Sequence, residues 1–281
     1  MAIRRKLPWR AGAWIGLSLA VIAALCLWTC SGYIAGKDAP TSTPPFGGYL
    51  VLDGWDDYAE AEDHPELDVG IAPGGSLTVE AWVLLRSPPP AYPKDFGIII
   101  NKNGAYQILG TWSPPRITFG LDSDPESWAM ARDVTWDPGW HHVAEVYDWE
   151  AGQLRGYMDG MLLGDPWNIG QHAVQDSPWW LRVSEWGPAS AWPGKIDEVR
   201  ISDVARYKGE TYQVPTSPFV CDEHTRALYH FDEIEGSTLF HDACGADNLL
   251  KGVGGAHTEG VKGHRVWLPF VAKRLLELLH R

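Results

Sequence analysis

The sequence predicts an all-β protein built as a sandwich of two antiparallel sheets. Its 281 residues include 30 Gly and 21 Pro, and only 21% are charged, which suits short strands joined by tight turns and argues against a helical bundle. Runs rich in aromatic and β-branched residues alternate with turn residues at fairly even spacing from residue 49 onward. In residues 140–163, two such runs are followed by Asp159-Gly160, a dipeptide suited to a two-residue hairpin turn, and by a third run. These residues predict a three-stranded meander.

The first strands of the predicted sandwich cover residues 49–52 and 76–84, with a turn at Asp53-Gly54 and a short extended piece at 56–59 between them. In 76–84, strict alternation puts Leu77, Val79, Ala81 and Val83 on one face and Glu80 on the other. A half-buried carboxylate needs a hydrogen-bonding or ionic partner. We therefore expect Glu80 to anchor a neighbouring strand.

Further strands are predicted at 97–101, 105–109 and 116–121, followed by turns at 122–126 and 136–139, the meander, a loop at 164–178, and strands at 179–183 and 191–202. His141 and His142 are adjacent in a strand, so their side chains point to opposite faces and do not readily chelate one metal ion. Six tryptophans fall in or near the predicted loops. Most are expected in the core, with one or two in an exposed binding patch: Trp128, Trp167, Trp179, Trp180, Trp186 and Trp192.

The N-terminus predicts a membrane-targeting segment. Its first ten residues include Arg4, Arg5, Lys6 and Arg10, and residues 11–30 carry no charge. This apolar run is long for the core of a signal peptide and long enough to span a bilayer, so we expect a signal anchor in 1–36 that leaves the rest of the chain outside the cell. Cleavage after residue 31 or 32, giving a secreted protein, and lipid attachment at Cys30 are the alternatives. A Pro- and Thr-rich tether follows at 37–48.

The chain is acidic, with a formal net charge of −13, and removal of the basic N-terminus makes the exported part more so. Such a surface repels nucleic acid and suits divalent cations or neutral partners, although it can also serve only to keep the domain soluble. Cys221 and Cys244 are the two cysteines of the exported part. Because oxidation is expected there, we predict that they form a disulfide.

Five segments occur in an order that resembles LamG-like jelly-roll domains. They are Tyr49-Leu50-Val51-Leu52-Asp53-Gly54, Thr78-Val79-Glu80-Ala81-Trp82, Trp140-His141-His142-Val143-Ala144, Tyr157-Met158-Asp159-Gly160 and Gly194-Lys195-Ile196-Asp197-Glu198-Val199-Arg200-Ile201. The resemblance covers residues 49–207 and implies a concanavalin A-like sandwich. It also implies a non-catalytic module of secreted or cell-surface proteins that binds glycans or proteins.

Residues 225–245 resemble the strand and loop that many relatives carry before the first of these segments, although here they come last. We expect the extension 219–265 to add the terminal strand to the same sandwich, giving a domain over 49–265, because the ends of such a fold lie close together. The start of a second repeat is the alternative, and its exposed strand would be a liability. Residues 266–281 predict a short amphipathic helix that contacts a membrane or a partner, or packs on its own domain.

The resemblance also suggests a structural calcium site. Relatives often hold Ca²⁺ between a first-strand acidic residue and the Asp of the Ile-Asp-Glu-Val strand, which implies Asp197 with Asp232 or Glu233 here. Carboxylates and loop carbonyls can supply the oxygen ligands that calcium needs. The alternative is that Asp197 and Glu198 pair with Arg200 or cap backbone amides.

Catalytic motifs are missing from the sequence. It contains no Glu-x-Asp-x-x-Glu run of the related glucanases, no His-Glu-x-x-His and no Gly-x-Ser-x-Gly. We therefore predict a membrane-anchored extracellular module that binds a carbohydrate or protein ligand without chemistry. A structural cell-surface protein without glycan binding is the alternative, and a divergent glycoside hydrolase is a third hypothesis.

Overall fold

The computed structural model of the chain describes residues 46–86, 95–123, 126–185, 190–246 and 248–260. They belong to the compact unit Pro40–Arg281, and the unit Met1–Ala39 lies outside them. The N-terminal segment 1–36, most of the tether 37–48 and the C-terminal segment 266–281 therefore fall outside the described residues and stay predictions. Within the ranges given, no helix has the length and apolar character needed to cross a membrane.

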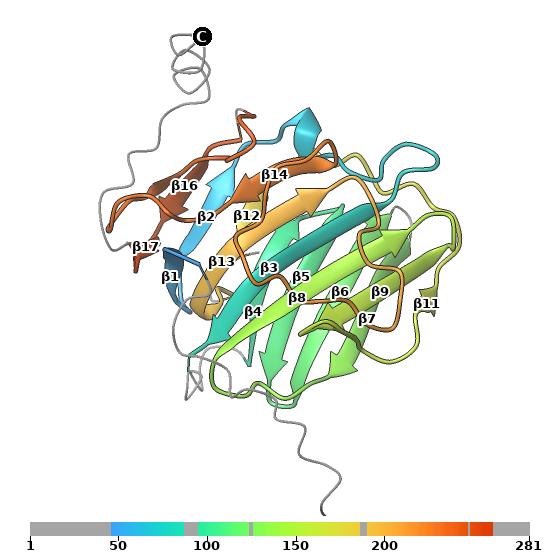
Figure 1. The fold of residues 1–281 in the computed structure, drawn as a ribbon, viewed down its shortest axis with the longest axis horizontal. Helices are drawn as coiled ribbons and strands as arrows, with labels where there is room; N and C mark the ends of the chain where they lie inside the picture. Colours follow the sequence, from blue (N-terminus) through green and yellow to red (C-terminus); the bar gives the residue numbers. More distant parts are fainter. Residues whose placement is uncertain (1–45, 87–94, 124–125, 186–189, 247, 261–281) are drawn as a thin grey trace, which may run out of the picture. The chain divides into compact units, whose positions relative to one another are not determined.

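Within the described residues, two antiparallel sheets lie face to face, which confirms the predicted all-β sandwich (Figure 1). The nine-stranded sheet has the order β10-β9-β8-β3-β13-β1-β17, with β11 paired to β9 and β14 paired to β13. Its strands are β1 (Tyr49–Asp53), β3 (Leu77–Leu85), β8 (Trp140–Asp148), β9 (Gln153–Met158), β10 (Met161–Leu162), β11 (Trp167–Asn168), β13 (Pro193–Ser202), β14 (Thr225–Tyr229) and β17 (His257–Glu259).

The eight-stranded sheet has the order β15-β16-β2-β12-β4-β5-β6-β7. A short 3-10 helix, η1 (Pro65–Leu67), follows β2. The strands are β2 (Tyr58–Ala61), β4 (Phe96–Lys102), β5 (Tyr106–Trp112), β6 (Pro115–Ser123), β7 (Glu126–Asp133), β12 (Leu181–Val183), β15 (Leu239–Phe240) and β16 (Leu250–Val253). The sequence reading missed β7, because the acidic residues at 122–126 suggested a broad turn where β6 and β7 pair up to Ser123 and Glu126.

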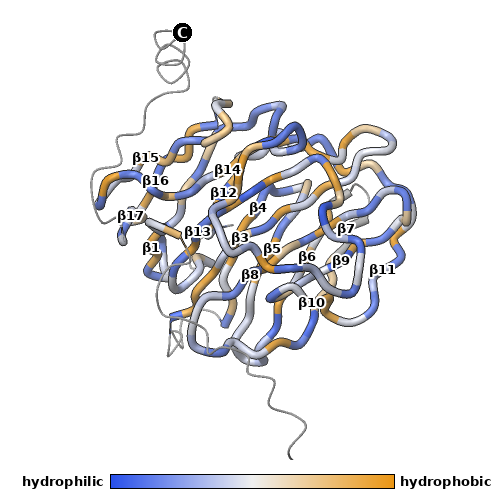
Figure 2. The backbone as a smooth tube through the Cα atoms, in the orientation of Figure 1, coloured by the Kyte–Doolittle hydropathy of each residue, from blue (hydrophilic) through white to orange (hydrophobic). Residues whose placement is uncertain are grey.

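The core lies between the two sheets and follows the alternation read from the sequence. Leu77, Val79, Ala81 and Val83 of β3 are all fully buried in it, as predicted. Figure 2 shows the hydrophobic colour recurring along strands of both layers. Burying alternate residues of each strand in one shared core is what drives such sheets together.

The predicted meander is present as β8, β9 and β10. Its second turn has φ 51° at Asp159 and 78° at Gly160, the positive values of a type I′ hairpin turn. A Cβ on Gly160 would lie 2.5 Å from the carbonyl oxygen of Tyr212, so the position also requires glycine for space.

The C-terminal strands complete both sheets. Along one edge of β13, the first half of the strand pairs with β1 and the second half pairs with β14. The change of partner lies at a bulge around Glu198, whose φ is 52°. Near the C-terminus, β17 pairs with β1 and β16 with β2. These pairings favour the permuted arrangement over a second repeat. The predicted disulfide is also confirmed, since Cys221 and Cys244 are bonded with a Cα–Cα distance of 5.5 Å.

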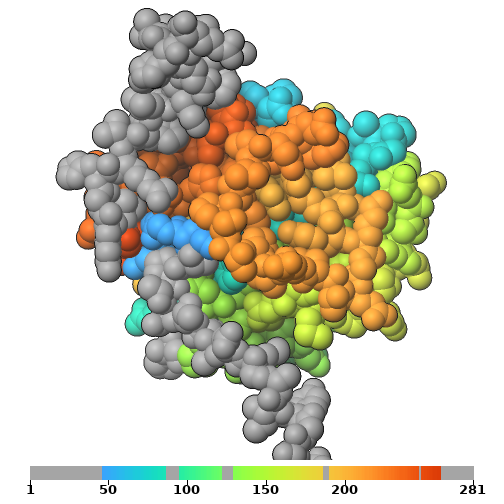
Figure 3. Space-filling view, in the orientation of Figure 1, coloured from blue at the N-terminus to red at the C-terminus, as the bar shows by residue number. Residues whose placement is uncertain are grey.

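The outer face of the nine-stranded sheet is covered by residues 203–222, which we call the covering segment. Orange atoms of this part of the chain spread over the face in Figure 3. Beneath it, Ala144, Val146 and Tyr157 form a second apolar cluster with Ala205. The hydroxyl of Thr78 on β3 also donates to the carbonyl of Val204 at 2.7 Å. This face is therefore sealed by the chain itself.

Glu80 lies under the covering segment, fully buried, and confirms the expectation that it anchors a neighbouring strand. Its Oε1 accepts hydrogen bonds from Nε and Nη2 of Arg200 on β13 at 2.8 and 2.7 Å. The Tyr207 hydroxyl donates to Oε2 at 2.7 Å. Burial opposes ionisation, but hydrogen bonding by His142 and the Arg200 charge lower the pKa of Glu80 to about 2.

Candidate functional site

The two adjacent histidines point to opposite faces of the nine-stranded sheet, as predicted. His141 faces Asp159, with 2.8 Å between Nδ1 and Oδ2. His142 lies on the covered face, where Nδ1 is 2.5 Å from the Tyr212 hydroxyl. Both rings are buried and hydrogen-bonded, so this strand contributes structure and offers no shared metal site.

The acidic residues predicted to hold calcium each accept a backbone amide. The amide of Glu198 donates to Asp197 at 2.8 Å, that of Gly48 to Asp232 at 2.7 Å, and that of His241 to Glu233 at 2.8 Å. Burial and the Glu198 charge raise the pKa of Asp197 well above its usual value.

Residues 46–48 run close to these carboxylates. A Cβ on Gly47 would lie 2.0 Å from Oδ1 of Asp232. Among the described residues, Asp197, Asp232 and Glu233 do not form a set whose ligand atoms all lie within 4.8 Å of one another. Each amide takes up one oxygen of its carboxylate, and Oδ2 of Asp197 and Oε2 of Glu233 are buried without a hydrogen-bond partner among the described residues. Calcium binding here stays a prediction. Of the alternative, the capping of backbone amides is seen, because Asp197 accepts the amide of Glu198 and Glu198 accepts that of Phe219 at 2.7 Å. The pairing with Arg200 is not seen among the described residues, where Arg200 pairs with Glu80.

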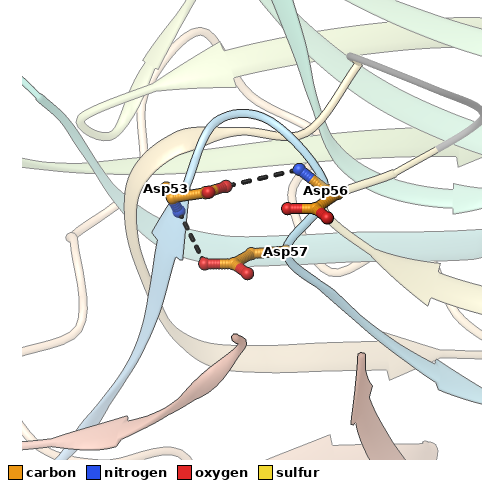
Figure 4. A group of neighbouring side chains, drawn as sticks. All are labelled: Asp53, Asp56 and Asp57. Atoms are coloured by element: carbon orange, nitrogen blue, oxygen red, sulfur yellow. Dashed lines mark hydrogen bonds between the residues drawn. The ribbon is translucent and has the colours of Figure 1, made fainter. Parts of the chain in front are cut away.

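Asp53, Asp56 and Asp57 are the described residues whose carboxylates do come that close (Figure 4). They lie in the turn between β1 and β2. Asp57 accepts the amides of Asp53, at 2.9 Å, and of Gly255, while Asp53 accepts the amides of Trp55 and Asp56 at 2.7 and 3.3 Å. Burial raises the pKa of Asp57, although its amide hydrogen bond from Gly255 opposes the shift. The cluster therefore shapes the turn through backbone hydrogen bonds.

A hollow of about 240 Å³ lies on the outer face of the eight-stranded sheet, and we call it the Trp180 hollow. Ala59 and Ala61 of β2 face the core, as do Leu181 of β12 and Leu250 of β16. Alternation consequently directs the intervening residues outward. The hollow is lined by Glu60, Glu62, Asp63, His64, Trp180, Leu249 and Lys251.

Trp180 is 42% exposed, which leaves part of the indole open to solvent beside three carboxylates. An indole is a large rigid apolar surface, and carboxylate, imidazole and ammonium groups supply hydrogen-bond acceptors and donors around it. This combination suits a ligand with an apolar face and a polar rim.

A buried ammonium group holds the two loops of the Trp180 hollow together. The Nζ of Lys102, with no exposed side-chain surface, lies 2.5 Å from Asp63 and 3.2 Å from Asp68. It also donates to the carbonyl oxygens of Ser177 and Trp179 at 2.7 and 3.0 Å. One cation therefore fixes the loop that carries Asp63 against the loop that carries Trp180, so the hollow is preorganised.

Glu60, on the floor of the hollow, is held by Arg182 of the adjacent strand. Nε and Nη2 of Arg182 both lie 3.1 Å from Oε2 of Glu60, and its guanidinium stacks 4.9 Å from the centre of the Tyr58 ring. The bidentate pair fixes the carboxylate in place.

A second, larger hollow of about 410 Å³ lies on the other side of η1, next to Arg226 and Asp203. No aromatic side chain lines it. Arg226 is already bound to Asp203 through two nitrogens. The Trp180 hollow is therefore the better candidate for ligand binding.

In a comparison with known families, residues 53–210 match a model described as the concanavalin A-like lectin/glucanases superfamily. The chain belongs to this superfamily. The match covers more than half of the chain and confirms the resemblance to LamG-like jelly-roll domains. No curated protein sequence matches the chain.

Solved structures with the concanavalin A-like fold resemble the chain at low sequence identity. A candidate carbohydrate-binding protein from Bacteroides ovatus has a TM-score of 0.54 and 17% identity, and the match covers 78% of this chain and 61% of that protein. A SAP-like pentraxin from Limulus polyphemus has a TM-score of 0.42 and 13% identity, covering 59% of this chain and 80% of the pentraxin. The receptor-binding domain of a botulinum neurotoxin of mosaic serotype C/D has a TM-score of 0.41 and 10% identity, and the match covers 60% of this chain and 40% of that chain. At these identities the likeness shows the fold.

The tryptophans of this concanavalin A-like chain divide as expected between core and surface. Trp192 is fully buried and Trp167 partly buried, whereas Trp179 and Trp180 are 60% and 42% exposed. Trp186 lies outside the described residues, as does the side chain of Trp128. Sequence reasoning named Trp180 but missed Glu60, Glu62 and Lys251 beside it. The alternation Tyr58-Ala59-Glu60-Ala61-Glu62, with small residues inward and acidic ones outward, was the signal that could have found the first two.

Proposed function

We propose that the chain is a non-catalytic carbohydrate-binding module whose ligand occupies the Trp180 hollow. The observation that carries the proposal is a partly exposed indole surrounded by carboxylate, imidazole and ammonium groups on an outer sheet face. A sugar ring has an apolar face that can lie on an indole and hydroxyls that both donate and accept hydrogen bonds. The likeness to the candidate carbohydrate-binding protein from Bacteroides ovatus supports this choice of ligand.

The module acts outside the cell, held at the membrane by the signal anchor expected in residues 1–36. The support is the charge pattern of the N-terminus together with the disulfide between Cys221 and Cys244, which forms in oxidising compartments. Fractionation of the native host should find the full-length chain in the membrane, with its sheet domain accessible to external protease. Recovery from the medium with a new N-terminus at residue 32 or 33 would replace anchoring by secretion.

The binding experiment compares wild-type protein with Trp180→Ala on an array of oligosaccharides. Loss of the indole face should weaken binding roughly tenfold, because stacking and the buried apolar contact disappear together. Trp55→Ala is the matched control, since Trp55 is 49% exposed but does not line the hollow. Absence of any bound glycan, or equal losses in both variants, would leave a structural cell-surface protein as the better account.

A glycoside hydrolase is the second candidate, because Glu60 and Glu62 both line the Trp180 hollow on one strand face. Hydrolysis needs one protonated carboxyl group and one ionised carboxylate. Glu60 is already engaged by the Arg182 guanidinium at 3.1 Å, an arrangement that suits a fixed hydrogen-bond acceptor better than a proton donor. Release of reducing sugar that disappears in Glu60→Gln would establish catalysis and overturn the non-catalytic proposal.

A further inference from the structure

We infer that the Trp180 hollow selects uncharged glycans and rejects glycans that carry carboxylate or sulfate groups, with Glu62 as the residue that sets this selectivity. The inference rests on the proposed function, since it names the class of glycan bound at the same site. The selectivity depends on two properties of the charged residues around the hollow: whether each is already in an ion pair, and whether it lines the hollow.

Two of the three carboxylates have cations behind them. Asp63 lies against Lys102, whose side chain is fully buried, and Glu60 lies against Arg182, which is 32% exposed. Neither cation lines the hollow, so its lining presents the carboxylates of the two pairs and not the cations to a ligand. Each pair also holds its carboxylate in position, and carboxylate oxygens are hydrogen-bond acceptors.

Glu62 and Lys251 differ from these residues. Both side chains are exposed, and neither takes part in an ion pair among the residues that the structure describes. Lys251 is the cross-strand neighbour of Glu60 on β16, whereas Glu62 extends the same face of the chain just beyond β2. Glu62 is therefore the one of the three carboxylates without an ion pair among the described residues, and it lines the hollow together with Trp180, Leu249 and Lys251.

The apolar side chains that line the hollow strengthen the repulsion between Glu62 and an anionic ligand. A carboxylate or sulfate group placed in the hollow would lie near Glu62, with Trp180 and Leu249 among the lining residues, and like charges repel more strongly where apolar side chains displace water. A neutral sugar has no such penalty, because its hydroxyls donate to the carboxylates and accept from Lys251. The single ammonium group of Lys251 does not offset the three carboxylates that face the ligand.

The test measures binding of matched oligosaccharides of equal length, one neutral and one with a uronic acid or a sulfated residue, by calorimetry at low salt. Wild-type protein should bind the neutral form at least roughly tenfold more tightly, the factor that corresponds to one like-charge contact in a partly desolvated site. Glu62→Gln should lower the ratio of the affinity for the neutral oligosaccharide to that for the anionic one, and Glu62→Lys should reverse the preference. Glu223→Gln, which removes an exposed charge just after the covering segment, should leave the ratio unchanged.

The outcomes separate the two proposals. If Trp180→Ala abolishes binding of both classes while wild-type protein binds them equally, carbohydrate binding stands and the selectivity inference is wrong. If Glu62→Lys leaves the preference unchanged, Glu62 does not set it. If neither class binds wild-type protein, the proposed function itself fails. High salt should reduce the preference, because exposed charges are screened within about 3 Å at 1 M.

Discussion

The two outer faces of the sandwich use similar residues in opposite ways. On the nine-stranded sheet, Glu80 and Arg200 form an ion pair beneath the covering segment, with both side chains buried. On the eight-stranded sheet, Glu60 and Arg182 form the equivalent cross-strand pair, but the face is open and Trp180 stands beside it in a hollow. On the sealed face the ion pair lies beneath the covering segment, whereas on the open face the corresponding groups are accessible to a ligand.

The difference teaches that burial decides what a polar cluster can do. The pKa of Tyr207 lies far above its usual value because of burial and the Glu80 charge, so its hydroxyl stays protonated and keeps donating to Glu80. Such a fully satisfied network specifies one packing and has no capacity left for a ligand. The Trp180 hollow, by contrast, has acceptors and an indole face that solvent reaches.

The largest expected effect is on the sealed face. Arg200→Met should lower the free energy of unfolding by roughly 3 to 5 kcal/mol, because it leaves the buried carboxylate of Glu80 without its cation. Arg116→Met is the matched control, since it breaks a strand pair with Asp133 whose partners are 48% and 80% exposed. There the loss should stay below about 1 kcal/mol. Denaturant unfolding measures both, and equal losses would contradict the contrast between the faces.

Removal of the disulfide should come next. Cys221 lies at the end of the covering segment and is joined to Cys244, 23 residues away. The double variant Cys221→Ser and Cys244→Ser should lose about 3 kcal/mol in the chain-entropy model of a loop of this size. Thermal unfolding with and without reductant checks this. A melting temperature that neither change moves would show that the crosslink does not stabilise the sealed face.

The contribution of the sealed face to the free energy of unfolding should also depend on pH. Because the folded pKa of Glu80, about 2, lies below the ordinary value of 4.5, its contribution is present above pH 4.5 and is lost as the pH falls toward 2. Wild-type protein should therefore lose roughly 2 kcal/mol more than Glu80→Gln between pH 5 and pH 3. Parallel stability curves for the two proteins would mean that Glu80 is not held ionised by its partners.

On the open face, Lys102→Met should cost roughly 1 to 2 kcal/mol and should also abolish glycan binding, because the loops that carry Asp63 and Trp180 lose their common anchor. Lys208→Met removes a half-exposed lysine far along the chain and serves as the control. Binding that persists in folded Lys102→Met protein would show that the hollow does not depend on this anchor.

The smallest expected effect is that of calcium removal. Backbone amides already donate to Asp197, Asp232 and Glu233. Because these three carboxylates are not gathered within 4.8 Å of one another, EGTA should leave the melting temperature nearly unchanged. A decrease that added calcium reverses would restore the site suggested by the family resemblance.

Local patterns predicted the fold well and the site poorly. Alternation in residues 76–84 placed Glu80 opposite the core side chains, and the same rule separated His141 from His142, because side-chain direction in a strand depends only on neighbouring positions. The Trp180 hollow instead joins β2, β12 and β16, which come from distant parts of the chain. No local pattern in the sequence shows that Lys251 lies beside Glu60, or that Lys102 ties two loops together. The capping of a backbone amide by Asp197 agrees with the alternative drawn from the sequence, whereas the amides of residues 48 and 241 reach Asp232 and Glu233 through the folding of the chain.

The most direct test of the open-face account is an NMR titration of isotope-labelled protein with a neutral oligosaccharide that binds. The largest chemical-shift changes should occur at the indole resonance of Trp180 and at residues of β2, β12 and β16. The Trp180 resonance is assigned as the one that is missing from the spectrum of Trp180→Ala. The backbone of the covering segment should stay unperturbed. Shifts centred on the covering segment and the nine-stranded sheet, with the Trp180 resonance unmoved, would contradict the account.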